Sequence, residues 1–246
     1  MSQSVAAIIC AAGKSSRFGG KRRKPFVDVG GRAAFLRCVE IFTDFDRVRQ
    51  VILAIPPEES ELVSVKWGPN LKFFGVEICT GGEHRFETVK AALSRIKEDI
   101  DLIAVHDAAR CCLRKEWVEA CFDAAQEQGA AIPACPVSDT LKRVDVGKVV
   151  GTIDRSDLWI AQTPQVFKAD LLKRAYAGLD KLDKEKISDD AQLVEALGEN
   201  VAVVTTDPSN MKITVGGDIA VAEAIIKSRP RPGPKGPVGP YYEAQW

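Results

Sequence analysis

The sequence predicts an α/β fold, a three-layer sandwich in which helices cover both faces of a mostly parallel sheet. Apolar runs recur along the chain without polar alternation, which is typical of strands buried on both faces. They stand at 5–12, 50–55, 101–105, 130–135 and 201–205. Stretches with helical periodicity lie between them, so strand and helix alternate. Right-handed crossovers then give a Rossmann-like arrangement, whose ligands bind at the carboxyl ends of the strands.

Three stretches carry the helical periodicity most clearly, because their apolar residues recur every three or four positions. The first face comprises Phe86, Val89, Leu93 and Ile96, the second Trp117, Ala120, Cys121, Ala124 and Ala125, and the third Ile219, Ala222, Ile225 and Ile226. We expect each of these faces to pack against the sheet.

Two segments break the alternation. Residues 136–160 hold β-branched residues around the turn signal Asp145-Val146-Gly147, which predicts a β-hairpin arm that leaves the main sheet. An arm of this kind often reaches a neighbouring subunit. Residues 230–246 contain five prolines and three glycines, typical of a polyproline-like or disordered tail. We therefore expect one domain over 1–229 and a tail over 230–246, too short for a second domain.

Composition limits the class of protein. The 246 residues are 46% hydrophobic, and 34 basic residues balance 34 acidic ones. The sequence has no apolar run of 18 residues, the length that a membrane span needs, and its N-terminus lacks a signal-peptide pattern. We therefore expect a cytoplasmic protein with no membrane partner. Its seven cysteines are odd in number and form no C-x-x-C pair, which favours reduced thiols in the core.

The segment 11–27, AAGKSSRFGGKRRKPFV, is the strongest local signal. It follows an apolar strand and holds three glycines and six cations without one acid. Because the whole chain is charge-balanced, this local excess predicts a loop that holds a polyanion. The cations are Lys14, Arg17, Lys21, Arg22, Arg23 and Lys24.

Several kinds of anion site compete for this loop. Its glycines do not form the dinucleotide motif G-x-G-x-x-G, and Lys21 is followed by arginine rather than the Ser or Thr of a P-loop. A nuclear-localisation signal, a nucleic-acid patch or a solvated basic turn remain open from the cluster alone. Only Phe18 and Phe26 lie near the cations, too few to stack nucleic-acid bases, so we expect no nucleic-acid partner.

An ordered set of motifs extends over most of the chain. They are AAGKSSRFGGKRRKPF at 11–26, GGEHRFETVKAAL at 81–93, VHDAAR at 105–110, PVSDTLKRV at 136–144, TIDRSDLWIAQTPQVF at 152–167, SDDAQLVEALG at 188–198 and NMKIT at 210–214. In this order they resemble the 2-C-methyl-D-erythritol 4-phosphate cytidylyltransferase family, from residue 5 to about 228.

The resemblance implies a nucleotidyltransferase fold and a defined reaction. A member of that family transfers CMP from CTP to 2-C-methyl-D-erythritol 4-phosphate, with Mg²⁺, in the non-mevalonate route of isoprenoid biosynthesis. The products are 4-diphosphocytidyl-2-C-methyl-D-erythritol and pyrophosphate. Fixed cations suit this chemistry, because two anions must meet while charge builds on the leaving group. The attacking phosphate is already nucleophilic, so no general base is required.

By resemblance, the basic loop holds the triphosphate. Arg17 and Lys24 match the cations that bind it and stabilise the transition state, while Ala11, Ala12 and Gly13 match backbone that approaches the nucleotide. A glycine suits a close approach because it has no side chain. The remaining four cations have no such counterpart and read as solvated charges.

The segment after residue 80 resembles the cytosine-binding part of the family. Its sequence predicts a two-glycine turn before a helix, with backbone amides free for a base or phosphate. The resemblance implies base contacts from Gly82, Glu83 and Thr88, with Arg85 supporting the turn. Thr88 stands where serine is usual, which keeps the hydroxyl.

Acceptor and metal residues follow from the later motifs. Asp107, at the end of a predicted strand, is implied as a Mg²⁺ ligand and a substrate contact. Arg110 and Ser188 match acceptor-binding residues, although Ser188 stands where threonine is usual. Lys212 matches a catalytic cation near both reacting phosphates, and His106 is expected to be a structural hydrogen-bonding residue.

The predicted hairpin carries a second part of the acceptor site. In the family the equivalents of Asp139, Thr140 and Arg155 reach across a homodimer interface, where Thr140 and Arg155 hold the acceptor phosphate in the other subunit. Arginine suits this role because its planar fork can bond two phosphate oxygens. Two alternatives remain open: a ribitol-5-phosphate cytidylyltransferase, and a non-catalytic relative whose basic loop binds anions or nucleic acid.

Overall fold

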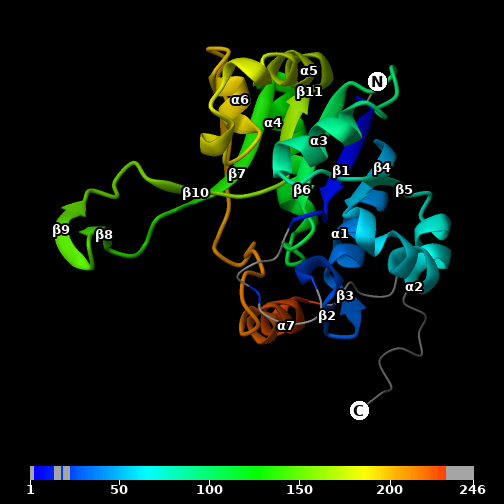
Figure 1. Ribbon diagram of the computed structural model, residues 1–246, viewed down its shortest axis with the longest axis horizontal. Coiled ribbons are helices and arrows are strands. Elements are labelled where there is room, and N and C mark those ends of the chain that lie inside the picture. Colours follow the sequence, from blue (N-terminus) through cyan, green and yellow to red (C-terminus); the bar gives the residue numbers. More distant parts are fainter. Residues whose placement is uncertain (1–2, 14–17, 19–22, 231–246) are drawn as a thin grey trace, which may run out of the picture.

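The computed structural model describes residues 3–13, 18 and 23–230, and its centre is one mixed, mostly parallel sheet (Figure 1). The order is β12-β7-β11-β6-β1-β4-β5, with β10 beside the second half of β7. All pairs are parallel except those made by β10 and β11. The strands are β1 Val5–Cys10, β4 Val48–Ile55, β5 Glu77–Thr80, β6 Leu102–Asp107, β7 Ala130–Pro136, β10 Trp159–Ala161, β11 Gln165–Lys168 and β12 Ala202–Thr205.

Helices cover both faces of the sheet, which confirms the predicted three-layer sandwich. Alternate residues of β1 point to opposite layers, so that Val5, Ala7 and Ile9 enter one core and Ala6 and Ile8 the other. The first core is closed by α1 Ala34–Thr43, α2 Ser60–Phe73, α4 Lys115–Gln128 and α7 Asp218–Ser228. The second is closed by α3 Arg85–Leu93, α5 Ala169–Ala177 and α6 Ala191–Glu195.

The central strands are buried as their continuous apolar sequences predict. Residues 5–9 of β1 and all of β6 are buried, whereas β12 alternates between half-buried and exposed residues. The expectation of burial on both faces is therefore wrong for β12, because this strand lies at the edge of the sheet beyond β7. The first apolar run also ends earlier than expected, since β1 stops at Cys10 and residues 11–13 form a loop.

The buried faces that the sequence predicts for the helices are mostly confirmed. Phe86, Val89, Leu93 and Ile96 are all buried in the second core. In α4, however, Ala120 is exposed and Val118 and Phe122 are buried instead. The two large side chains turn the buried face away from the small alanine, because burying more apolar area stabilises the fold more.

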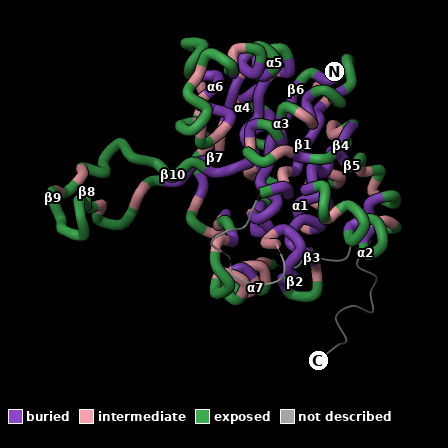
Figure 2. The backbone as a smooth tube through the Cα atoms, viewed as in Figure 1, coloured by how far each residue is buried: buried purple, intermediate pink, exposed green. Residues whose placement is uncertain are grey.

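The segment 136–160 forms an arm outside the main sheet. Strands β8 Leu141–Asp145 and β9 Lys148–Ile153 form an antiparallel hairpin and pair with no other described strand. Val146 and Gly147 connect them, with φ of 43° and 75°, the left-handed conformation of a tight hairpin turn. Figure 1 shows the hairpin extended to the left of the sheet, and Figure 2 shows that it is mostly exposed.

Smaller features complete the fold. Short strands β2 Asp28–Val29 and β3 Arg32–Ala33 form a separate pair, and single-turn 3₁₀ helices occur at η1 Lys24–Phe26, η2 Pro57–Glu59, η3 Leu179–Lys181 and η4 Lys184–Lys186. All seven cysteines are free, as expected. Within the described ranges no helix has the length and apolar character that crossing a membrane would need. The proline-rich tail from 231 onward lies outside the described residues.

Candidate active site

The carboxyl ends of the central parallel strands gather the residues that the motifs singled out. Cys10, the last residue of β1, pairs with Asp107, the last residue of β6. The loop at 11–13 follows β1, the loop at 108–110 follows β6, and the two-glycine turn follows β5. Loops at this edge of a parallel sheet meet around one crevice, the usual ligand site of such folds.

The loop after β1 is anchored to the sheet and then emerges at the surface. The amide of Ala11 donates to the carbonyl of Ala54 in β4 at 2.8 Å, and Ala11 and Ala12 are buried. Gly13 is exposed, and a Cβ added there would meet no atom of the described residues within 4 Å. The described part of the chain therefore does not require glycine at 13 and leaves space on this side of the loop.

Only part of the basic loop lies within the described residues. Arg17, expected to bind the triphosphate, lies outside them, as do Lys14, Lys21 and Arg22. Lys24 begins the single turn η1, whose next residues Pro25 and Phe26 are buried. The ring of Phe26 stacks on Trp67 with centroids 5.7 Å apart, so this turn is anchored in the first core.

The turn after β5 packs directly against the loop after β1. A Cβ on Gly81 would lie 2.5 Å from the Cβ of Ala12 and 2.8 Å from Oγ1 of Thr88. A Cβ on Gly82 would lie 2.4 Å from the Cβ of Glu87. Gly81 is therefore required by the close approach of the two loops, and Gly82 by the packing of the turn against α3. Gly81 is absent from the residues predicted for the site, although the Gly-Gly pair is its visible signal.

The helix α3 begins at this turn and fixes its shape. The backbone amide of His84 donates to the carboxylate of Glu87 at 2.9 Å, as part of a capping box. Thr88 is 2% exposed, and its hydroxyl lies 3.2 Å from the carbonyl of His84 and 3.4 Å from that of Gly82. Thr88 thus supports the turn in this structure, while Glu83 is exposed beside it. Their contact with a base stays a prediction.

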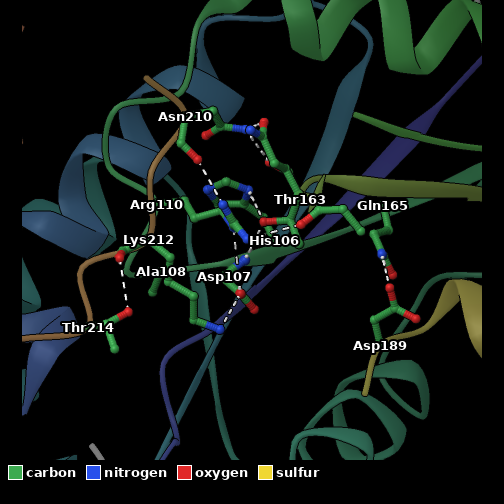
Figure 3. Close-up of polar contacts among 12 residues, drawn as sticks. His106, Asp107, Ala108, Arg110, Thr163, Gln165, Asp189, Asn210, Lys212 and Thr214 are labelled. Carbon is green, nitrogen blue, oxygen red and sulfur yellow. Dashed lines mark hydrogen bonds and ion pairs between the residues drawn. The ribbon is translucent and has the colours of Figure 1, made fainter. Parts of the chain in front are cut away.

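Asp107 lies at the centre of a group of cations (Figure 3). Its Oδ2 accepts from Nζ of Lys212 at 2.6 Å, its Oδ1 accepts from Nε of Arg85 at 3.2 Å, and Nε of Arg110 lies 3.8 Å from Oδ2. Burial by itself raises the pKa of Asp107, but Lys212, Arg85 and Arg110 outweigh burial and hold the pKa well below its ordinary value. The carboxylate is therefore charged at neutral pH.

Arg85 connects this centre to a second buried carboxylate. Its guanidinium also bonds Oδ2 of Asp190 at 2.6 Å, and the side chain of Asp190 is only 1% exposed. The hydroxyl of Tyr176 donates to Oδ1 of Asp190 at 2.6 Å. Arg85 thus bridges two carboxylates. The resemblance implies a different role for it, that of supporting the turn after β5. Asp190 lies in the S-D-D-A motif, which is its only sequence signal, and nothing in the sequence singles out Tyr176.

His106 lies behind Asp107 in the core and has a structural environment. It is completely buried, and its Nδ1 lies 3.0 Å from the hydroxyl of Thr163. That hydroxyl also accepts from the backbone amide of Asp107 at 3.1 Å. Burial lowers the pKa of His106 to about 3, so the ring is neutral. It therefore helps to fix the backbone of Asp107 and carries no charge into the site.

A buried amide network holds the segment that carries Lys212. The side-chain amide of Asn210 donates to Oε1 of Gln162 at 2.9 Å and to the carbonyl of Thr163 at 3.1 Å. Arg110 donates from NH1 to the carbonyl of Asn210 at 2.8 Å. Figure 3 shows Asn210 and Arg110 above Asp107. Arg110 and Lys212 are therefore held together although they lie far apart in the sequence.

The other expected acceptor residues lie outside this centre. Ser188 is exposed, and its hydroxyl bonds Oε1 of Gln192 at 3.2 Å ahead of α6. Thr140 precedes β8 and Arg155 follows β9, and both are exposed on the arm that extends away from the sheet (Figure 1). Arg155 donates to the carbonyl of Ser138 within the same arm. One chain therefore gathers Asp107, Arg110 and Lys212 but does not bring Thr140 and Arg155 to them.

The side chains available as metal ligands limit how a metal ion could bind at this site. Among the described residues no group of three or more His, Cys, Asp and Glu side chains could hold a metal ion. Asp107 is a single carboxylate with cations on both oxygens, so it fits Mg²⁺ only as one ligand among several. Mg²⁺ commonly binds through one or two carboxylates and completes its shell with phosphate oxygens and water. The residues fit a metal that arrives with a polyphosphate.

The site lies at the strand ends of an α/β sheet, where glycine turns and cations surround one carboxylate. These features are typical of proteins that bind phosphate groups. Comparisons with known proteins name the family. The family model "2-C-methyl-D-erythritol 4-phosphate cytidylyltransferase" matches residues 5–228. Since the match covers nearly the whole chain, the protein belongs to the 2-C-methyl-D-erythritol 4-phosphate cytidylyltransferase family.

Individual relatives agree with the family model. The enzyme of that name from Endomicrobium trichonymphae is 39% identical over 91% of this chain and 99% of its own length. The one from Bacillus licheniformis is 35% identical over 91% of this chain and 96% of its own length. A crystal structure of the Thermus thermophilus enzyme covers 92% of this chain and all of its own, with a TM-score of 0.74 and 32% identity. The predicted fold class and family are confirmed.

Proposed function

We propose that the protein transfers CMP from CTP to 2-C-methyl-D-erythritol 4-phosphate, forming 4-diphosphocytidyl-2-C-methyl-D-erythritol and pyrophosphate. The observation that carries the proposal is the group of Lys212, Arg85 and Arg110 around Asp107, at the strand ends of a chain that belongs to the family of that name. The reaction needs fixed positive charge where two phosphates meet, and this group supplies it.

The chemistry is an in-line displacement at phosphorus. A phosphate oxygen of the acceptor forms a bond to the α-phosphorus of CTP, while the bond from that phosphorus to the bridging oxygen of pyrophosphate breaks. Pyrophosphate leaves with the electron pair of the broken bond. Negative charge grows on the leaving group and around the α-phosphorus, so cations fixed in advance lower the barrier.

Lys212 is placed to serve the incoming phosphate. Its side chain is 42% exposed although its Nζ lies 2.6 Å from Oδ2 of Asp107. An anionic phosphate in the crevice offers Nζ a partner of higher charge, so Nζ turns from the carboxylate to the phosphate. Arg85 and Arg110 stay beside Asp107 and keep the carboxylate charged after that movement. In this proposal Lys212, Lys24 and Arg17 are the catalytic cations.

No side chain needs to act as a general base. The acceptor phosphate is an oxyanion at neutral pH and is itself the nucleophile. The pKa of His106, which burial lowers to about 3, leaves it neutral and buried behind Asp107. His106 therefore acts on the position of Asp107 and not on a proton of the substrate.

The two adjoining loops suit the nucleotide part of CTP. The loop of Ala11, Ala12 and Gly13 packs on the two-glycine turn, and in the proposal both present backbone groups to the cytidine. Gly82 and Glu83 then contact the base, and Thr88 either contacts it or holds the turn that does. The space that the described residues leave beside Gly13 supports this assignment.

Magnesium belongs to the proposal as the ion that accompanies the triphosphate. Asp107 would be its one ligand from the protein, and phosphate oxygens and water would complete the shell. The ion would supply positive charge to the triphosphate oxygens. We place the enzyme in the cytoplasm, as one domain over 1–229 with the tail 230–246, and without nucleic-acid or membrane partners.

We also propose a homodimer joined through the 136–160 arm. Four valines on the hairpin are more than half exposed: Val144 at 57%, Val146 at 92%, Val149 at 64% and Val150 at 57%. Exposed apolar side chains gathered on one protruding element are typical of an interaction surface. The arm would carry Thr140 and Arg155 to the acceptor phosphate in the partner's site, with Ser188 as a further contact within each chain.

The experiment is a pyrophosphate-release assay on the purified chain with CTP and Mg²⁺. The proposal expects release with 2-C-methyl-D-erythritol 4-phosphate and little with ribitol 5-phosphate, and loss of release when CTP is replaced by ATP. Preference for ribitol 5-phosphate would overturn the substrate assignment. No release with either acceptor, together with salt-sensitive binding to nucleic acid, would favour a non-catalytic relative instead.

A further inference from the structure

Arg23 is one of the two cations of the basic loop that the structure describes, and acids and carbonyls of this chain surround it. Its NH1 lies 3.3 Å from the carbonyl oxygen of Gly13 and 3.5 Å from that of Ala12. Its NH2 bonds Glu58, and its Nε lies 3.5 Å from Glu59. All three guanidinium nitrogens therefore have oxygen partners within the chain.

These contacts join three segments that are separate in the sequence. Ala12 and Gly13 follow β1, Glu58 and Glu59 lie in the turn η2 that follows β4, and Arg23 immediately precedes Lys24 at the start of η1. One guanidinium thus ties the segment that carries Lys24 to the loop proposed to bind cytidine.

We infer that Arg23 is a positioning residue for CTP. Together with Glu58 and Glu59, it holds the start of η1, where Lys24 lies, against the carbonyls of residues 12 and 13. We call this set of five residues the Arg23 clasp. The inference rests on the proposed function, since it assigns the clasp to the triphosphate half of that site. Arg23 acts through Lys24 and the loop after β1, and it does not itself contact the substrate.

The charges of the clasp argue against a simpler role in attracting CTP. Arg23 contributes one positive charge, whereas Glu58 and Glu59 contribute two negative charges at the same place. The clasp therefore has a net charge of about minus one, which by itself repels a triphosphate. If Arg23 served only to attract the anion, the two acids would oppose its function.

The chemistry of arginine explains why this residue type stands here. A planar guanidinium directs its donors outward in a fixed fork, so it can bond two carbonyls and two carboxylates at once. An ammonium group keeps the charge but lacks that planar fork. The side chains of Arg23 and Glu59 are 23% and 19% exposed, so water only partly weakens their interaction.

The sign of one effect separates the clasp from simple attraction. In the pyrophosphate-release assay with the full chain, the double variant Glu58→Gln/Glu59→Gln removes two negative charges near the triphosphate site. Attraction alone predicts a lower KM for CTP. The clasp predicts a KM about three- to tenfold higher, the range expected for the loss of two partly exposed ion pairs. The KM for the acceptor should stay within about twofold.

Two further variants serve as controls. Glu61→Gln removes a charge from an exposed acid one turn further along, in α2, and should leave the KM for CTP unchanged or slightly lower. Arg23→Lys keeps the charge and should nonetheless raise the KM for CTP, by about the same three- to tenfold as the loss of both acids. If the acid variant does not fold, Arg23→Lys alone decides the question.

The outcomes are distinguishable from failure of the proposed function. If the wild-type chain turns over CTP while the acid variant has an unchanged or lower KM, or Arg23→Lys behaves as wild type, the clasp is wrong and the function stands. If the wild-type chain does not turn over CTP, the function fails and the positioning role fails with it. A thermal-unfolding cycle of Arg23→Gln, Glu59→Gln and their double variant would still show whether the pair is coupled.

Discussion

The centre around Asp107 and the 136–160 arm differ in how far one chain completes them. Around Asp107, cations and buried amides from four separate segments already make hydrogen bonds or ion pairs with one another. On the arm, strands β8 and β9 pair with each other and with no other described strand, and the valines near the turn are mostly exposed. The centre is built by the fold of one chain, whereas the arm presents a surface that the described part of this chain does not cover.

This difference indicates separate roles for the two regions in the site. A charged centre that must lower a reaction barrier benefits from donors fixed in advance, and burial and hydrogen bonds fix those at Asp107. Residues that complete the site from an exposed arm become fixed only when a second copy is present. We therefore expect mutations in the centre to change stability or rate in one chain, and mutations on the arm to act through the assembly.

The largest expected effect is on the stability of the centre. Asp190→Asn removes a buried charge that Arg85 and Tyr176 both bond, and leaves Arg85 with Asp107 alone. Breaking a buried ion pair in this way should lower the free energy of unfolding by about 3 kcal/mol, measured by urea denaturation.

Arg155→Gln on the arm is the matched comparison, because Arg155 is exposed and bonds only its own segment among the contacts described. It should leave the urea midpoint nearly unchanged. Equal losses for the two variants would show that the arm is as tightly integrated in the folded chain as the centre, and the contrast between the two regions would be wrong.

The next effect is on rate. Lys212→Met keeps most of the side-chain length and removes the charge that we place at the reacting phosphates. The value of kcat should fall about 100-fold, which corresponds to about 2.7 kcal/mol of transition-state stabilisation, as for loss of one fixed donor. Lys227→Met, on the exposed part of α7, should have no effect on kcat. A Lys212 variant with full turnover would contradict the mechanism.

A smaller effect concerns pH. Because burial lowers the pKa of His106 to about 3 in the folded state, the unfolded chain takes up a proton below its ordinary pKa while the folded chain does not. The stability from neutral His106 is therefore complete above about pH 6.5, and it falls by about 1.4 kcal/mol per pH unit as the pH is lowered from there toward 3.

Urea denaturation between pH 7 and 4.5 measures this slope. His106→Gln cannot take up that proton, so its free energy of unfolding should depend less on pH over this range. The low pKa of Asp107 contributes mainly below about pH 4, outside the range measured. Equal slopes for the wild type and the variant would contradict the role of a neutral, buried His106.

The sequence predicts the parallel core well but not its rim. Continuous apolar runs predict β1, β4, β6 and β7, because strands buried on both faces need no polar alternation. The short strands β10 and β11 are not predicted, since residues such as Gln165 are placed by tertiary contacts rather than by local pattern. Gln165 is 1% exposed, and its side chain accepts from the amides of Asp190 and Ala191.

The site divides in the same way. The resemblance to the family implies that Asp107, Arg110 and Lys212 lie near the site, and the structure brings them together. The buried partner Tyr176 has no local signal, because its contact with Asp190 depends on how α5 packs. Arg23 stands in a visible cluster of cations, yet the spacing does not predict the two segments that supply its acceptors. The sequence alone does not predict which side chains from distant segments contact one another.

The central claim is that each site takes Asp107 and Lys212 from one chain and Arg155 from a second copy. Mixing unfolded Arg155→Gln and Lys212→Met chains and refolding them together tests it most directly. Each variant alone should be nearly inactive. Random pairing makes half the dimers mixed, and each mixed dimer has one intact site, so the mixture should recover about a quarter of wild-type pyrophosphate release. A mixture no more active than the average of the two variants would contradict a shared site.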